Sequence, residues 1–176
     1  MKKSFWVIIF SLLVSCKATE SVISNYDETI DFNAYSTFVI CVDDLFVENT
    51  SFPNYDNNMV REFISNAVEK EMIDFGHKTN VLNPQLQAGF KITIEEQQNT
   101  FKNCDYNNSL DYWQNCTICT ETYTEETLIL YVSDIKRNQV IWQGSINCSL
   151  NKPKKSLENY INSIVNTLFK HYPKSK

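Results

Sequence analysis

The chain has 176 residues, which is the size of a single folded domain. Hydrophobic residues make up 43% and aromatic residues 13%, and only three glycines and four prolines occur, so the composition excludes collagenous and low-complexity proteins. The formal charge is −5, and loss of a leader that carries two lysines takes it to −7. A chain this acidic repels phosphate groups, so nucleic acid is not an expected partner.

The first sixteen residues have the pattern of a bacterial secretion signal that ends in a lipidated cysteine. Lys2 and Lys3 precede an apolar stretch, 5–14, that is too short to cross a bilayer as a helix. Residues 13–16 read Leu-Val-Ser-Cys, which resembles the lipobox of bacterial lipoproteins. We therefore expect cleavage after residue 15 and a diacylglyceryl group on Cys16, whose lipid chains hold the protein on a membrane. The alternative is an ordinary secretory peptide with a chance cysteine.

The expected lipid places the rest of the chain in the cell envelope as a membrane-anchored protein. Lys17 follows the cysteine, where an aspartate would favour the inner membrane, so known sorting rules favour the outer membrane. We expect a signal peptide at 1–15, the lipidated cysteine and a polar tether at 16–25, and one globular domain at 26–173.

The first half of the domain is predicted to hold one strand and one helix. Residues 36–42 are rich in β-branched and aromatic side chains on both faces, as expected of a strand inside a sheet. Apolar residues then recur at helical spacing over 60–75, with Asn57 or Asn58 as the N-cap and Gly76 just past the end.

The middle of the chain has weaker patterns. Residues 78–82 fit a short strand, and alternation over 90–95 predicts a half-buried strand. No convincing period appears over 97–120.

The last part is predicted to form a hairpin and a second helix. Strands at 122–133 and 140–146 flank a turn at 134–138, with Gly144 as a candidate bulge. Apolar residues over 157–169 then form an amphipathic helix. These elements predict an α+β fold in which an antiparallel sheet of about four to five strands carries both helices on one face.

Four short motifs occur along the chain: an acidic-aromatic stretch at 26–32, Tyr-Ser-Thr-Phe at 35–38, a helix end at 73–77 and a closing hairpin at 128–134 and 140–144. Together they resemble the lipoprotein family called domain of unknown function 4136. His77 stands where the family usually has tyrosine or phenylalanine. The resemblance implies a membrane-tethered α+β domain with no established activity and no catalytic residues to carry over.

The cysteines suggest a disulfide in a long connection between strands. The segment 100–120 is longer than the family's usual connection, and Cys104 lies in it with Cys116 and Cys119. We expect Cys104 to form a disulfide with Cys116 or Cys119. Closing this loop would stabilise the folded chain by about 3 kcal/mol. The five cysteines left after lipidation are an odd number, so at least one is expected to be unpaired: Cys41, Cys104, Cys116, Cys119 and Cys148.

Two other chemistries are weaker alternatives at the same cysteines. Cys116 and Cys119 have the spacing of a redox dithiol, which would make the protein a periplasmic thiol/disulfide enzyme. With Cys104 they would need a fourth ligand, His77 or Cys148, to hold zinc. Because neither context fits well, we expect no catalytic residue, no metal and no cofactor beyond the lipid.

Polar and aromatic residues offer a candidate recognition surface. Tyr106, Tyr112 and Trp113 lie in the cysteine segment among Asn and Asp, a composition suited to partner binding. The alternative is that these aromatic side chains only hold a long loop against the sheet. The paired carboxylates at 95–96 and 125–126 fit a solvated strand end better than acid-base catalysis. The expected function is therefore a noncatalytic envelope module that binds another protein or a glycan.

Overall fold

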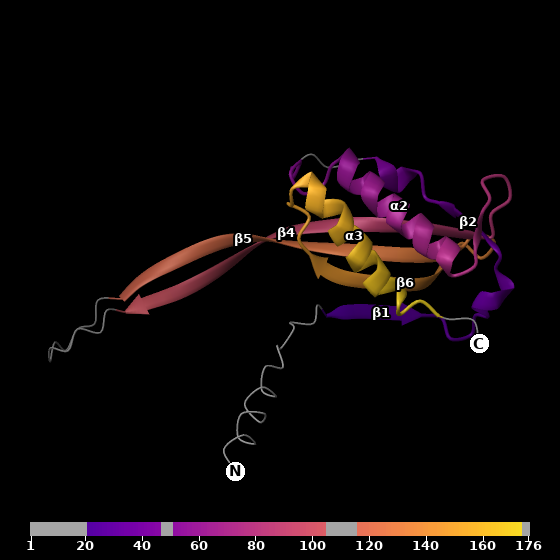
Figure 1. The fold of residues 1–176 in the computed structure, drawn as a ribbon. Helices are drawn as coiled ribbons and strands as arrows, with labels where there is room; N and C mark the ends of the chain where they lie inside the picture. The colour runs from indigo at the N-terminus through magenta and orange to yellow at the C-terminus, as the bar shows by residue number, and fades with distance from the viewer. Residues whose placement is uncertain (1–20, 47–50, 105–115, 174–176) are drawn as a thin grey trace, which may run out of the picture.

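The computed structural model describes residues 21–46, 51–104 and 116–173. Six strands form one sheet in the order β1-β6-β5-β4-β2-β3, and helices α2 and α3 cover one of its faces (Figure 1). The short 3-10 helices η2 (Phe32–Ala34) and η3 (Asp43–Leu45) flank β2. The main elements are β1 (Val22–Tyr26), β2 (Thr37–Ile40), α2 (Asn58–Asp74), β3 (Lys78–Thr79), β4 (Leu86–Cys104), β5 (Cys116–Asp134), β6 (Gln139–Cys148) and α3 (Lys154–Phe169).

The predicted α+β class with both helices on one face is confirmed, but the sheet is mixed and has six strands. β1, β6, β5 and β4 pair antiparallel, whereas β2 runs parallel to both β3 and β4. The prediction of four to five antiparallel strands is therefore wrong in number and direction. The parallel pairs arise because α2 carries the chain across the sheet between β2 and its two neighbours, and such a crossover returns the chain in the same direction.

β1 forms an additional edge strand, and its residues 22–25 belong to the segment 16–25 that was expected to be tether. Its residues pair with β6, from Val22 opposite Ile146 to Tyr26 opposite Trp142. Because Ile146 also pairs with Leu128 of β5, the beginning of β1 shares one row of the sheet with the middle of β5.

The predicted boundaries of α2 are confirmed by its caps. The side chain of Asn57 accepts a hydrogen bond from the Val60 N–H at 3.1 Å, which satisfies one of the free donors of the first turn. At the other end Gly76 adopts φ of 94°, a left-handed conformation that stops the helix.

Neither helix among the described residues has both the length and the apolarity needed to cross a membrane.

The predicted hairpin of β5 and β6 is confirmed, but its bulge is not at Gly144. Gly144 pairs with Leu130, whereas Ile141 is left over between the pairs Val132–Trp142 and Ser133–Val140. A Cβ on Gly144 would lie 3.2 Å from Leu168, so this glycine is explained by the close approach of α3 to β6.

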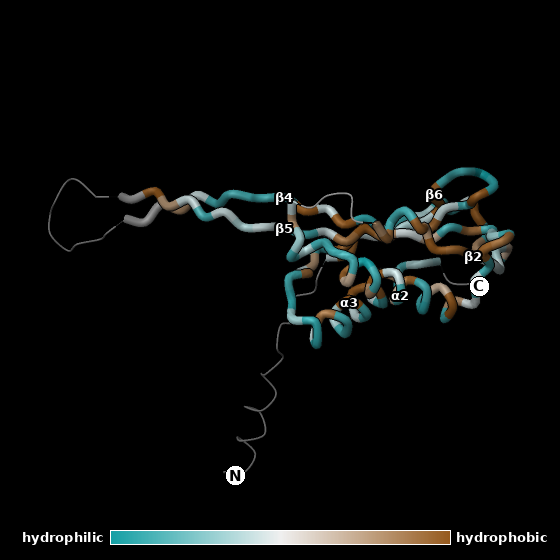
Figure 2. The backbone as a smooth tube through the Cα atoms, turned by 90° about the horizontal axis from the view of Figure 1, so that it is seen from above, coloured by the Kyte–Doolittle hydropathy of each residue, from teal (hydrophilic) through white to brown (hydrophobic). Residues whose placement is uncertain are grey.

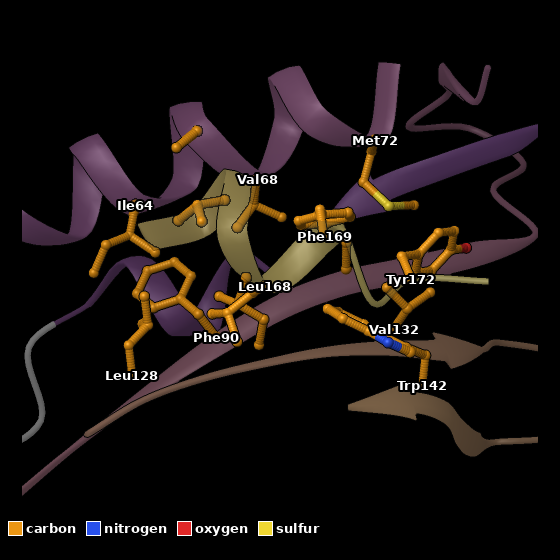
Figure 3. Packing of buried hydrophobic residues seen from close by; sticks show 14 of the residues in the cluster. Ile64, Val68, Met72, Phe90, Leu128, Val132, Trp142, Leu168, Phe169 and Tyr172 are labelled. Atoms are coloured by element: carbon orange, nitrogen blue, oxygen red, sulfur yellow. The ribbon is translucent and has the colours of Figure 1, made fainter. Parts of the chain in front are cut away.

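The core lies between the helices and the covered face of the sheet (Figure 3). Trp142 is fully buried, packs against Phe169 with ring centroids 5.2 Å apart, and donates from Nε1 to the carbonyl oxygen of His171 at 3.2 Å. The buried side chains that α2, α3, β4, β5 and β6 contribute to this cluster include Ile64, Val68, Met72, Phe90, Leu128, Val132, Leu168 and Phe169.

Candidate functional site

β4 and β5 continue beyond the helix-covered body of the domain as a two-stranded ribbon, which we call the arm (residues 95–104 and 116–125). β6 pairs with β5 only as far as Glu126, and β2 pairs with β4 only as far as Ala88. The pairing of β4 with β5 continues without a break to Cys104 opposite Cys116. Ten residues of extended strand are about 30 Å long, so the arm projects well away from the core (Figure 1).

The arm has two exposed faces of different character. One face continues the side of the sheet that no helix covers, and we call it the open face. The other continues the helix side and carries Ile118 and a run of threonines at 120, 122 and 124. The open face consists of successive cross-strand pairs, Glu95–Glu125, Gln97–Tyr123, Asn99–Glu121 and Phe101–Cys119.

The arm exposes large apolar side chains. Phe101 is 50% exposed, Tyr123 45% and Ile118 68%. Figure 2 shows hydrophobic residues returning towards the outer part of the arm after a hydrophilic base. Phe101 and Tyr123 share the open face, whereas Ile118 lies on the other face. Because burial of such side chains is favourable, a partner that covered either face would gain stability from them.

Two glutamates face each other where the arm leaves the body. Glu95 and Glu125 are directly opposite on the open face, and like charges in this position destabilise a sheet. Glu125 accepts from Asn147 Nδ2 at 2.8 Å, and Glu95 accepts from Gln97 Nε2 at 3.3 Å. In the described parts of the chain neither carboxylate has an ion-pair partner.

The predicted recognition residues Tyr106, Tyr112 and Trp113 lie outside the described residues, between the ends of β4 and β5. The described arm therefore adds residues that the sequence analysis missed, chiefly Phe101 and Tyr123. The signal for Tyr123 was the threonine-rich composition of 117–127, which favours a strand, whereas Phe101 lies outside that stretch.

The arm separates the two cysteines of the Cys-x-x-Cys motif. Cys116 and Cys119 are three positions apart on β5, so they belong to opposite faces and their Cα atoms are about 10 Å apart. A disulfide requires Cα atoms within about 7 Å. The register places Cys104 opposite Cys116, while Cys119 lies opposite Phe101. Of the two predicted pairings, the register favours Cys104 with Cys116.

The remaining cysteines do not converge on the arm. Cys41 is buried after β2, and Cys148 ends β6 opposite Glu126, ten positions along β5 from Cys116. His77, proposed as a fourth zinc ligand, lies near the beginning of β4, whereas Cys104 ends that strand about 60 Å away. The alternative prediction of a zinc site that combines these residues is therefore wrong. Among the described residues no three His, Cys, Asp or Glu side chains form a group that could hold a metal ion.

His77 joins three distant segments at the end of the body opposite the arm. Its Nδ1 lies 3.1 Å from the carbonyl oxygen of Tyr35, and its Nε2 lies 3.2 Å from the hydroxyl of Tyr172. A neutral imidazole satisfies both contacts by donating from Nδ1 and accepting at Nε2. Burial lowers the pKa of His77. A cleft of about 500 Å³ opens beside it, bordered also by Phe32 and Phe75.

The two neighbouring glutamates at 125–126 lie in different environments. Glu126 is buried and accepts a hydrogen bond from the Leu150 N–H, and burial raises the pKa of its carboxyl group. Glu125, its neighbour, is on the open face. Because adjacent strand positions point to opposite faces, the two carboxylates cannot act together on one substrate.

Asp44 makes two hydrogen bonds that the sequence analysis did not anticipate. Its Oδ2 accepts from the Phe90 N–H at 2.8 Å and from the Tyr131 hydroxyl at 2.7 Å, so it binds the edge of β4 just after β2 ends. A Cβ at Gly89 would lie 2.3 Å from this oxygen, which explains the glycine within the strand.

Taken together, the fold and the arm define an α+β domain with a projecting β-ribbon. A family model described as Domain of unknown function (DUF4136) matches residues 22–174. Because this match covers the whole described domain, the chain belongs to that family, and the resemblance expected from its motifs is confirmed.

Solved structures show the same fold at low sequence identity. A DUF4136 family protein from Bacteroides thetaiotaomicron has a TM-score of 0.55 and 17% identity, covering 91% of this chain and 100% of that one. A PDZ domain protein from Parabacteroides distasonis has a TM-score of 0.55 and 14% identity, covering 89% of this chain. The match covers only 36% of that longer protein. No curated protein matches the chain.

The burial of His77 and its contacts with Tyr35 and Tyr172 predict that the free energy of unfolding depends on pH. The pKa of His77 is lowered in the folded state, so below about pH 6.5 the unfolded chain takes up the proton first. The contribution of this group to stability is therefore complete above that pH and falls as the pH is lowered below it. We expect urea unfolding of His77→Gln to lose this part of the pH dependence. The exposed His171→Gln should keep it, and an unchanged slope in His77→Gln would contradict the assignment.

The arm register predicts how the cysteines react. In protein isolated from its native cells without reductant, we expect peptide mapping to show Cys104 linked to Cys116. Cys119 is exposed and should be alkylated in the native state, whereas Cys41 is only 8% exposed and should react after unfolding. A linked peptide that contains Cys119 would show that the register of the arm is wrong.

Proposed function

We propose that the protein is a noncatalytic lipoprotein of the cell envelope whose arm binds another envelope component, protein or glycan. The lipid on Cys16 would anchor it to the outer membrane. The leader and the Leu-Val-Ser-Cys sequence at 13–16 support the anchor. The family match begins at residue 22, so the leader and the lipid-accepting cysteine precede the folded domain.

The observation that carries the binding proposal is the arm itself. A two-stranded ribbon without a third strand or a covering helix is only marginally stable in water. The arm contributes nothing to the core, yet it spends about twenty residues on a surface that exposes Phe101, Ile118 and Tyr123. A partner that covers these side chains would supply the burial that the body does not provide.

The alternative, a thiol/disulfide enzyme or metal-binding module at Cys116 and Cys119, has less support. A redox dithiol needs two sulfur atoms that can bond to each other, ideally with the first at a helix N-terminus. Here the two cysteines occupy opposite faces of one strand. No contact of the described residues favours this chemistry over binding.

The lipid anchor can be tested directly by mass spectrometry. We expect the N-terminal peptide of the mature protein to begin at Cys16 and to carry the mass of a diacylglyceryl group. Cys16→Ser should lose the lipid, whereas Cys119→Ser should keep it. An unmodified Cys16 in the native, membrane-associated protein would contradict the proposal.

The binding role can be tested by shortening the arm. Residues 97–123 are replaced by Asn-Gly, which joins Glu96 to Thr124 through a two-residue hairpin turn where the two residues already face each other. Because every buried side chain of the core is retained, we expect the melting temperature to stay within a few degrees. Crosslinking in intact cells should then lose the partner that the full-length protein captures. Capture of the same partner at equal yield by the shortened protein would contradict the proposal.

A further inference from the structure

The outer edge of β5 in the arm is an unpaired strand edge. β6 stops pairing at Glu126, and among the described residues no strand continues along 118–125. In an antiparallel ribbon every second residue directs its N–H and C=O away from the paired strand, so this edge presents free donors and acceptors. An extended peptide can satisfy them by joining the sheet as one more strand.

We propose that this edge binds an extended segment of a partner protein as an added strand, and that the segment carries Lys or Arg at two positions four residues apart. The inference rests on the proposed binding function and specifies the chemistry of the partner. The added strand would continue the line of β6 beyond the point where β6 ends.

The charge of the open face sets the predicted pattern. Glu125, Tyr123 and Glu121 occupy alternate positions of β5 and share this face, about 7 Å apart. An added strand has the same repeat, so its side chains on this face adjoin these three in turn. Basic side chains at positions j and j+4 would therefore meet Glu125 and Glu121, and an apolar or aromatic residue at j+2 would pack on Tyr123.

The pair of glutamates at the base of the arm strengthens the preference for a cation. Glu95 lies directly opposite Glu125, so the basic residue at position j would approach two carboxylates at once. It would relieve a like-charge contact that the ribbon otherwise retains. On the other face, the threonines at 120, 122 and 124 suit β-branched neighbours.

The charge of the arm assigns the added strand to β5 rather than to β4. On the open face β5 carries both Glu121 and Glu125, whereas β4 carries Glu95 followed by Gln97 and Asn99. Nearer the body, the Phe90 N–H of β4 is bound by the carboxylate of Asp44.

The test uses eight-residue synthetic peptides of alternating Thr and Val, in which Lys occupies positions 2 and 6. Comparison peptides carry Glu at 2 and 6, Lys at 2 and 5, or N-methyl groups on alternate amides. With the full-length protein and fluorescence anisotropy, we expect the 2,6-lysine peptide to bind at least tenfold more tightly than the glutamate peptide. It should bind about fivefold more tightly than the 2,5-lysine peptide, which has the same total charge but places its two lysines on opposite faces of the strand.

Matched variants separate local recognition from overall charge. Glu121→Gln with Glu125→Gln should weaken binding at least fivefold. Glu62→Gln with Glu158→Gln removes the same charge from exposed positions on α2 and α3 and should leave binding unchanged. Tight binding of the N-methylated peptide, equal binding of both lysine peptides, equal loss in both variants, or no binding of any peptide would each overturn the inference. Loss of capture on shortening the arm would still support the proposed function in those cases.

Discussion

The unbroken pairing of β4 with β5 is the constraint on which both the body and the arm depend. In the body this register turns Phe90 and Leu130 towards the helices and leaves Tyr131 on the opposite side. The same alternation continues outward and determines that Tyr123 and Glu121 share the open face. A slip of one residue would exchange the two faces along the entire ribbon. The burial of the core therefore fixes which residues the arm displays.

The elements that could be predicted from the sequence are those with one buried and one exposed side. α2 and the β5–β6 hairpin have this property, and their hydrophobic periods located them correctly. The outer half of β4 was missed because the side chains of residues 97–101 are exposed or half-exposed on both faces, so this stretch has no hydrophobic alternation to detect. The parallel pairing of β2 was missed for another reason, since it depends on contacts between residues far apart in the chain.

The candidate site was only partly predictable, because the same spacing in the sequence places two residues differently on a helix and on a strand. Three positions between cysteines suit a helix start, but they separate the two residues when the segment is a strand. His77 illustrates the opposite case. Its partners Tyr35 and Tyr172 are 42 and 95 residues away, so no local pattern indicated that this side chain closes the end of the body.

The row that links Val22, Ile146 and Leu128 places the start of the domain at the end of the body from which the arm leaves. Five residues lie between Cys16 and Val22, and a fully extended chain spans about 20 Å at most between these two positions. With a lipid on Cys16, the base of the arm is confined to a thin layer above the bilayer, and the arm itself adds about 30 Å. The arm would then reach only a thin layer next to the membrane, so the partner that we propose would have to present its binding segment close to the lipid.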